Sequence, residues 1–230
     1  MCLVSYIPRP NGYLLSSNRD EFVDRNADDI VTERVGRHKL YFPRDTKGGS
    51  WIIASDSDVH VVVLNGAFKN HQRKLPYRKS RGVMMKEFFE YTDSVDFFEQ
   101  YEFVGIEPFT MIIASKTDLY EFRWDGYQKH VNGLNKEKVH IWSSCTLYDQ
   151  EGSDRRERIL RRELSNLDSH SLSDHADAHL FIDKNDEKLG LRVKLLAKLM
   201  TVSHTQIDVN YEVTLVHKNL LSGYTKRLKI

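Results

Sequence analysis

The chain has 230 residues, 40% of them hydrophobic, and this length predicts a single domain over residues 1–230. Its 34 basic and 33 acidic residues give a net charge of +1, which excludes strong overall attraction to nucleic acid or anionic membranes. No apolar run approaches the ~20 residues that cross a bilayer, so we expect no stable membrane insertion. Two cysteines and no signal-peptide pattern predict a cytoplasmic protein without a disulfide framework.

Two β-like runs open the chain, at residues 2–7 and 12–17. The PRPNG segment between them favours a tight turn, so they form a predicted hairpin. A polar stretch follows at 18–29. A second hairpin is predicted from the runs at 51–55 and 59–65. The first 65 residues are therefore expected to be mostly sheet.

Along the whole chain, the predicted strands come in two groups, and helices follow each group. Residues 168–187 resemble a loop with uncertain helical content, and 191–200 fit either a helix or a strand. This order favours an α+β fold with largely antiparallel sheets. The predicted helices are 81–92, 94–103 and 153–167, the last capped by Ser153, and the predicted strands are 109–115, 118–126, 138–144 and three runs after residue 200.

Cys2 directly follows the initiator methionine. Removal of Met1 leaves a thiol nucleophile and a free α-amine on one residue, and that amine can accept the thiol proton. This is the logic of an N-terminal nucleophile acting on an amide. The alternative is an inert, buried cysteine in the first strand.

The segment SSNRDEF, residues 16–22, ends the second predicted strand. The hairpin folds this end back towards Cys2, so Arg19 is placed to stabilise a thiolate and Asp20 to orient the terminal ammonium. The alternative is a solvated turn with a weak surface ion pair.

Five ordered motifs carry a family resemblance: MCL at the start, NRDE at 18–21, PRDTKGGSW at 43–51, LN at 64–65 and SRG at 80–82. Together they resemble the NRDE protein family, which includes eukaryotic transport and Golgi organisation proteins. The resemblance implies an N-terminal-nucleophile hydrolase type of fold, similar to penicillin V acylases and bile salt hydrolases. That fold is a four-layer αββα sandwich of two largely antiparallel sheets covered by helices.

Site roles follow from the same resemblance, residue by residue. The nucleophile falls on Cys2, its supporting groups on Arg19 and Asp20, and an oxyanion-hole donor on Asn65. Asn65 has an alternative role as the start of a turn with Gly66. Arg44 and Asp45 favour a surface ion pair. Substrate contacts are expected from Asn18, Glu21, Trp51 and Arg81, the last beside a helix start that Ser80 also caps in an ordinary way.

Two positions depart from the family pattern. The asparagine of a family Ser-Asn pair matches Cys145, and the arginine of a family Thr-Arg-Ser pattern matches Val202. A thiol is a poor replacement for an amide donor, so these departures weaken the hydrolase interpretation.

Histidines His170, His175 and His179 invite a metal-site hypothesis, but HADAH lacks the glutamate of HExxH. A polar loop is favoured, and no metal is expected.

Two functions remain open. The first is a hydrolase of a small linear amide that uses Cys2 and needs no cofactor. The second is a non-catalytic binding or carrier protein for an amphipathic ligand such as haem or an acyl-coenzyme A, with Cys2 or a histidine as the haem ligand. The expected partner is a small molecule in both cases, and a homo-oligomer remains possible.

Overall fold

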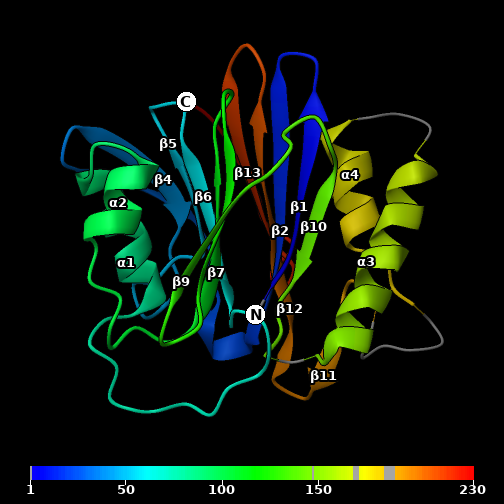
Figure 1. Cartoon of the computed structure of the whole chain (residues 1–230). Coiled ribbons are helices and arrows are strands. Elements are labelled where there is room, and N and C mark those ends of the chain that lie inside the picture. The colour runs from blue at the N-terminus through cyan, green and yellow to red at the C-terminus, as the bar shows by residue number, and fades with distance from the viewer. Residues whose placement is uncertain (1, 147, 168–170, 184–189) are drawn as a thin grey trace.

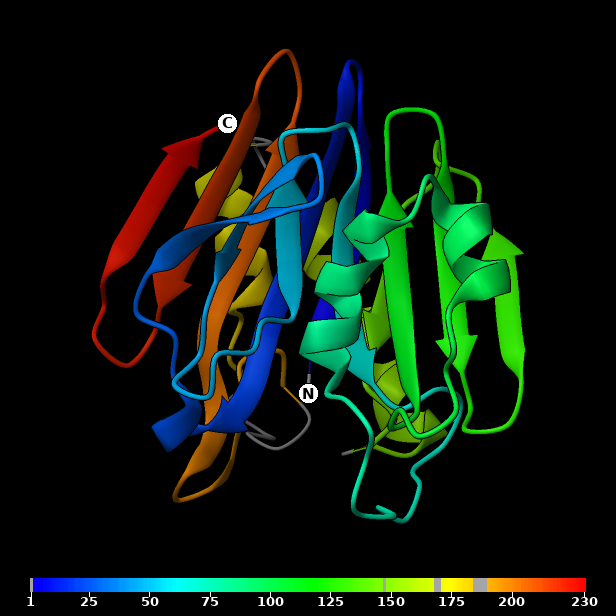
Figure 2. The same ribbon diagram turned by 90° about the vertical axis from the view of Figure 1, so that its left-hand side faces the viewer.

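In the computed structural model, two antiparallel sheets stack face to face and helices cover their outer faces (Figure 1, Figure 2). The structure describes residues 2–146, 148–167, 171–183 and 190–230. The first sheet contains, in spatial order, β10 (His140–Ser143), β1 (Cys2–Arg9), β2 (Gly12–Phe22), β12 (Leu199–Val209), β13 (Val213–Asn219) and β14 (Thr225–Lys229), with β11 (Lys194–Leu196) paired to β12.

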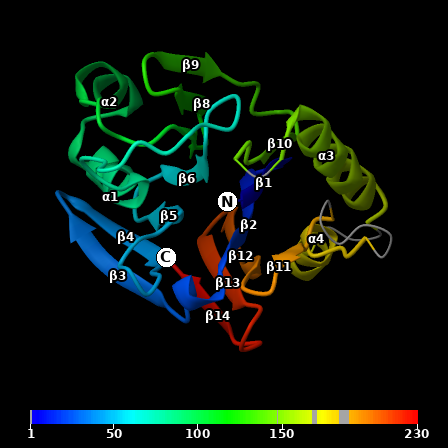
Figure 3. The ribbon, with the colours of Figure 1, turned by 90° about the horizontal axis from the view of Figure 1, so that it is seen from below.

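The second sheet follows chain order without a crossover. Its strands are β3 (Ile30–Val35), β4 (His38–Pro43), β5 (Ile52–Ser55), β6 (His60–Asn65), β7 (Phe109–Ala114), β8 (Leu119–Trp124) and β9 (Lys129–Gly133). Helices α1 (Arg81–Glu87) and α2 (Ser94–Gln100) cover this sheet, whereas α3 (Gln150–Ser165) and α4 (Leu172–His179) cover the first. Seen from below, the two helix pairs lie on opposite sides of the sheets (Figure 3). The predicted α+β, αββα sandwich is confirmed.

The apolar core is divided between three layers. Alternation along β1 sends Cys2, Val4 and Tyr6 into the space between the sheets and Leu3 towards α3 and α4. An aromatic layer lies under α1 and α2, where the fully buried Phe97 contributes about 2–3 kcal/mol through burial. Strands buried on both faces, such as β6, therefore appear in the sequence as continuous apolar runs.

Both predicted hairpins and the three closing strands are present, and residues 191–200 contain β11 and the first residues of β12. Three strands, β3, β4 and β9, were not predicted. The last is mostly exposed at the sheet edge, and it lacks the apolar alternation that marks a half-buried strand.

Two helix predictions are corrected. The segment 168–187, expected to be a loop with uncertain helical content, contains α4, whose N-cap is Ser171. The longest helix begins at Gln150 and not at 153, because the Asp149 carboxylate accepts a hydrogen bond from the Gly152 N–H (2.8 Å) and caps it.

η1 (Val23–Arg25) and η2 (Phe88–Glu90) are short 3₁₀ turns. Among the described residues, no helix is long and apolar enough to cross a membrane.

A β-bulge lies beside the start of the chain. Cys2 pairs with Arg19 in the β1–β2 hairpin. On the other side of β2, Thr201 pairs with Asp20 and Ser203 with Arg19, so Val202 is the extra residue. A bulge interrupts regular pairing and bends its strand. The irregularity therefore lies at the same end of the sheet as Cys2.

Candidate functional site

A cavity of about 620 Å³ opens at the end of the sandwich where β1 begins and β2 and β6 end. We call it the Cys2 cavity. Its walls come from these three strands, from the segment before β5, from residue 107 and from the connection between β6 and α1. We call that connection the 66–80 loop.

Cys2 and Arg19 share one face of the hairpin. They are directly opposite in register, so both side chains point between the sheets, and both line the cavity. Cys2 is only 2% exposed. The guanidinium of Arg19 lies 4.5 Å from the ring centroid of Trp51, which forms another part of the wall. The sequence-based placement of Arg19 and Trp51 near Cys2 therefore agrees with the geometry.

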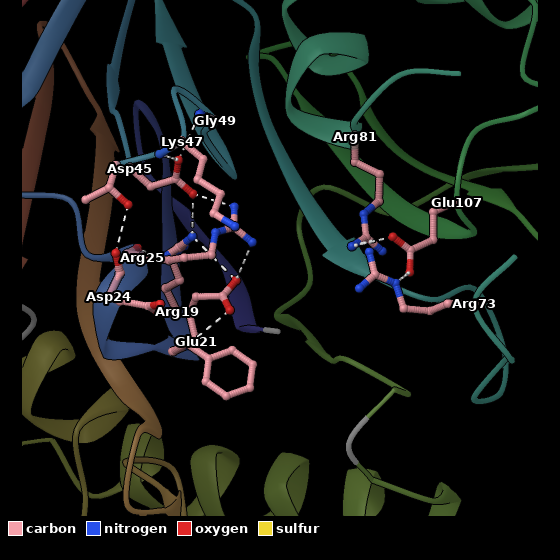
Figure 4. Close-up of polar contacts among 12 residues, drawn as sticks. Arg19, Glu21, Asp24, Arg25, Asp45, Lys47, Gly49, Arg73, Arg81 and Glu107 are labelled. Atoms are coloured by element: carbon pink, nitrogen blue, oxygen red, sulfur yellow. Dashed lines mark hydrogen bonds and ion pairs between the residues drawn. The ribbon is translucent and has the colours of Figure 1, made fainter. Parts of the chain in front are cut away.

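An ion-pair cluster surrounds Arg19 (Figure 4). Its Nη2 lies 2.8 Å from Asp45 Oδ2 and 3.5 Å from Glu21 Oε2. Arg25 contacts the same two carboxylates, at 2.5 Å and 3.1 Å. The other oxygen of Asp45 accepts the Gly49 N–H at 2.9 Å. The predicted surface pair between Arg44 and Asp45 is thus replaced by a buried cluster.

Burial and charge act in opposite directions on this cluster. Burial lowers the pKa of Arg19, while Glu21 and Asp45 counteract that effect. Burial also tends to raise the pKa of Glu21, but the charge of the N-terminus, the Phe22 N–H and the charges of Arg19 and Arg25 outweigh it and lower that pKa. Glu21 therefore stays ionised at the cavity wall.

A second cluster forms another part of the wall, on the side of α1 (Figure 4). Glu107 Oε1 lies 3.1 Å from Arg73 Nε, and its Oε2 lies 3.2 Å from Arg81 Nη2. Burial lowers the pKa of Arg81, and Glu107 opposes the shift. Ser80 caps α1 as expected. Gly82 is required for close packing here, because a Cβ would lie 2.8 Å from the Ser50 carbonyl oxygen.

The cavity lining carries excess positive charge. Among the described residues, three carboxylates line it, from Glu21, Asp45 and Glu107, and the lining cations are Arg19, Arg25, Arg73, Arg78, Lys79 and Arg81. The formal excess is therefore three positive charges. Such a lining favours a ligand with negative charge.

Asn65 lines the cavity at the end of β6. The Ser144 hydroxyl donates to the Asn65 carbonyl oxygen (2.8 Å), and the Ser144 N–H donates to the Cys2 carbonyl oxygen (3.0 Å). Ser144 thus ties the end of β6 to the start of β1. Cys145 packs against Gly66, where a Cβ would lie 2.4 Å from its Sγ. Burial raises the pKa of Cys145, which is not among the cavity-lining residues.

The structure does not bring Asp20 to Cys2, and this corrects its expected role. Asp20 is fully buried on the opposite face of β2, where its carboxylate accepts hydrogen bonds from Thr201 Oγ1 (2.7 Å) and Arg156 Nη2 (3.2 Å). Successive side chains of a strand point to opposite faces. The sequence-based prediction favoured Asp20, although period-two alternation along the strand places Glu21, and not Asp20, on the face of Arg19.

Asn18 also faces away from the cavity, contrary to the expected substrate contact. Its Nδ2 donates to the main-chain oxygens of His179 (2.7 Å) and Leu191 (3.0 Å). Its amide oxygen is therefore the acceptor for His204 Nδ1, at 2.7 Å. Asn18 joins β2 to α4 and β12.

Arg25 and Glu107 were not predicted to belong to the site, and for the basic run from Lys69 to Lys79 a solvated loop was favoured over a site for an anionic ligand head group. They come from irregular segments whose side chains have no periodicity that predicts their direction. Only the tertiary fold brings them to the cavity.

The histidine segment gives no metal centre within the described residues, where no group of three or more His, Cys, Asp or Glu side chains is placed to hold an ion. His175 and His179 lie on α4, and both are buried. His170, the third member of that hypothesis, lies outside the described residues.

Comparisons with known proteins give the family and the fold. Residues 1–217 match the family model described as Transport and Golgi organisation 2. No curated protein sequence matches the chain.

Solved structures with a similar fold include penicillin V acylase from Agrobacterium tumefaciens, with TM-score 0.58, 10% identity and coverage of 100% of this chain and 86% of that one. A variant of conjugated bile acid hydrolase from Clostridium perfringens has TM-score 0.58 and 7% identity, and the match covers 99% of this chain and 92% of that one. At these identities the likeness shows a hydrolase-like fold.

Proposed function

This chain belongs to the Transport and Golgi organisation 2 family, and on that premise we propose that it hydrolyses a linear amide with Cys2 as an N-terminal nucleophile. The observation that carries the proposal is the common face of Cys2, Arg19 and Glu21 at one cavity. The hydrolase-like fold supports it.

The proposed reaction has two stages. The α-amine of Cys2, free after removal of Met1, accepts the thiol proton while sulfur attacks the amide carbonyl carbon. The C–N bond then breaks, the proton passes to the leaving amine, and a thioester remains. Water next attacks the thioester carbonyl, its proton returns through the α-amine to sulfur, and the carboxylic acid leaves.

Three neighbours assist in this scheme. The ionised carboxylate of Glu21, two residues after Arg19 on the same strand face, holds the protonated α-amine. The charge of Arg19 favours the anionic sulfur. The Asn65 amide donates to the carbonyl oxygen as it becomes negative.

The charge of the lining narrows the substrate class. An excess of three positive charges supports an amide that carries a carboxylate, sulfonate or phosphate group.

Reactivity of the thiol tests this proposal. Tag-free protein is treated briefly with a thiol alkylator, and intact mass with peptide mapping locates the label. We expect loss of Met1 and labelling of Cys2 faster than in denatured protein, and slower labelling in Glu21→Gln. Cys145, whose pKa burial raises, is the internal control. Retained Met1, or labelling of Cys2 no faster than in denatured protein, would overturn the proposal.

A carrier function is the second candidate, and the positive lining supports it as well, because haem and acyl-coenzyme A are both anionic amphipathic molecules. Among the described residues that line the cavity, Cys2 is the only cysteine or histidine, so haem iron would bind its thiolate. A saturable Soret shift on haemin titration that Cys2→Ser abolishes is expected. No shift, or an unchanged shift in the variant, would count against haem.

A further inference from the structure

The 66–80 loop projects beyond the sheets at the cavity end of the sandwich (Figure 1, Figure 2). Its sequence, GAFKNHQRKLPYRKS, contains no carboxylate. Five cations are spread along it: Lys69, Arg73, Lys74, Arg78 and Lys79. The net charge of +1 for the whole chain therefore conceals a strongly basic segment.

Much of this charge is not neutralised by ion pairs. Arg73 and Lys79 pair with Glu107 and Glu87, which lie outside the loop. Among the described residues, the remaining three cations have no carboxylate partner: Lys69, Lys74 and Arg78. Positive charge is thus available for a partner at this end.

Large apolar side chains are exposed beside these cations. Leu75 is 70% exposed and Phe68 is 50% exposed. Lys74 Nζ bonds Tyr127 Oη at 3.2 Å, which places the 77% exposed Tyr127 against the loop. Arg78 Nε donates to the carbonyl oxygen of Val104, which is 67% exposed. Exposed apolar groups gathered in this way mark an interaction surface.

We infer that this end of the protein docks on the surface of an anionic bilayer, with the loop cations against lipid phosphates and Phe68, Leu75, Val104 and Tyr127 at the level of the headgroups. The docking is interfacial and needs no membrane-spanning segment.

Two further carboxylates, Glu102 and Asp125, lie in the segments next to the loop, and each is engaged by local main-chain N–H groups. A nucleic acid fits the surface less well, because the aliphatic Leu75 and Val104 have no role on a phosphate backbone or in base stacking.

Docking would open a route between the bilayer and the Cys2 cavity. Leu75, Tyr77 and Arg78 belong both to the loop and to the cavity wall. An amphipathic anion could then pass from the headgroup region to the cavity without crossing water. This route rests on the proposed function, whereas the docking itself does not.

Vesicle flotation tests the docking. Full-length protein is mixed at low salt with phosphatidylcholine vesicles, with or without phosphatidylserine. We expect binding only to the vesicles with phosphatidylserine, and weakening by added salt. Lys69→Gln/Lys74→Gln, which changes no cavity-lining residue, should weaken binding about thirtyfold at roughly 1 kcal/mol per lysine. Leu75→Ser should weaken it about fivefold through loss of apolar burial.

The matched control is Lys136→Gln/Lys138→Gln. It also removes two lysines, but Lys136 lies beside the β1–β2 turn at the opposite end of the sandwich. This variant should bind vesicles like the unchanged protein, and circular dichroism should show both double variants folded.

Other outcomes would overturn the inference. Equal flotation with neutral vesicles, or equal binding by both double variants, would contradict docking through the loop. Tight binding of an RNA oligonucleotide without flotation would assign the surface to nucleic acid, and displacement from vesicles by inorganic phosphate would assign it to a free anion. Cys2→Ala separates the two proposals, because it should lose thiol chemistry and still float.

Discussion

The two faces of β2 give its NRDE segment two different environments. Arg19 and Glu21 point between the sheets to the Cys2 cavity. Asn18 and Asp20 point to the helix layer, where both are fully buried. Asn18 is hydrogen-bonded to His204 and to the main chain of α4, and Asp20 to Arg156 and Thr201. Neighbouring residues of this segment therefore have different roles. Arg19 and Glu21 line the cavity, whereas Asn18 and Asp20 bind the sheet to its helices.

The contrast shows how burial changes the role of a carboxylate. Glu21 forms ion pairs with two arginines, Arg19 and Arg25, at the wall of an open cavity. Among the described residues, Asp20 has one buried arginine and one hydroxyl as side-chain donors, and Arg156 has no other carboxylate partner there, so removal of the Asp20 charge leaves the Arg156 charge uncompensated. The four predictions below test this difference.

Asp20→Ala should have the largest effect. Breaking a fully buried ion pair leaves an unpaired charge, so we expect a loss of about 3–5 kcal/mol in the free energy of unfolding, measured by urea denaturation. Glu21→Ala is the control and should cost about 1 kcal/mol or less. Equal losses for the two variants would break the distinction between the faces.

Glu21→Gln should act on chemistry and not on folding. Removing the charge that holds the α-amine should slow alkylation of Cys2, and amide turnover when a substrate is known, by about tenfold to a hundredfold. The urea midpoint should remain nearly unchanged. Asp20→Asn, if it folds, is the comparison, since a larger loss of Cys2 reactivity there would return the amine-orienting role to Asp20.

His204 should make the helix-facing side sensitive to acid. Burial lowers its pKa from 6.5 to about 3, with smaller effects from Lys218 and His217. The unfolded chain therefore takes up the proton first as pH falls, and stability declines from pH 6.5 towards pH 3, by about 1.4 kcal/mol per pH unit. His204→Asn retains a donor for Asn18 and should make this decline shallower, by about 2 kcal/mol at roughly pH 5. An unchanged slope in the variant would contradict a buried neutral His204.

Arg25→Gln should have the smallest effect. Its side chain is 34% exposed, and Asp45 and Glu21 keep Arg19 as a partner. Screening by solvent limits the expected loss of stability to under about 1 kcal/mol, measured by thermal unfolding. Arg19→Gln is the matched change in the buried arginine of the same cluster, and it should cost more. A larger loss of stability in Arg25→Gln than in Arg19→Gln would show that the partly exposed Arg25, and not the buried Arg19, holds this cluster together.

Much of the fold was predictable because its signals are local. Alternating apolar residues and the PRPNG turn predicted the first hairpin, and its register sets Cys2 against Arg19. Strand β9 escaped detection because it is an exposed edge, and α4 because its mixed composition resembles a loop. The eight-residue helix α4 is too short to be stable alone and depends on the packing of its buried face.

The site was predictable only in part. Six residues singled out by the ordered motifs line the cavity: Cys2, Arg19, Glu21, Trp51, Asn65 and Arg81. Asp45, Glu107 and most of the cations come from turns and loops, whose side-chain directions depend on the packing of distant segments. No local pattern in Asp45 or Glu107 indicates that these residues meet an arginine far along the chain.

By itself, the sequence determined the hairpin, the family and the position of Cys2 at the start of the first strand, because these follow from short-range patterns and ordered motifs. Tertiary structure alone decided which carboxylate faces Cys2, how much positive charge surrounds it and which side chains remain exposed at its entrance. Those properties depend on the register of β2 between β1 and β12 and on the course of the 66–80 loop, and both are set by contacts between residues far apart in the chain.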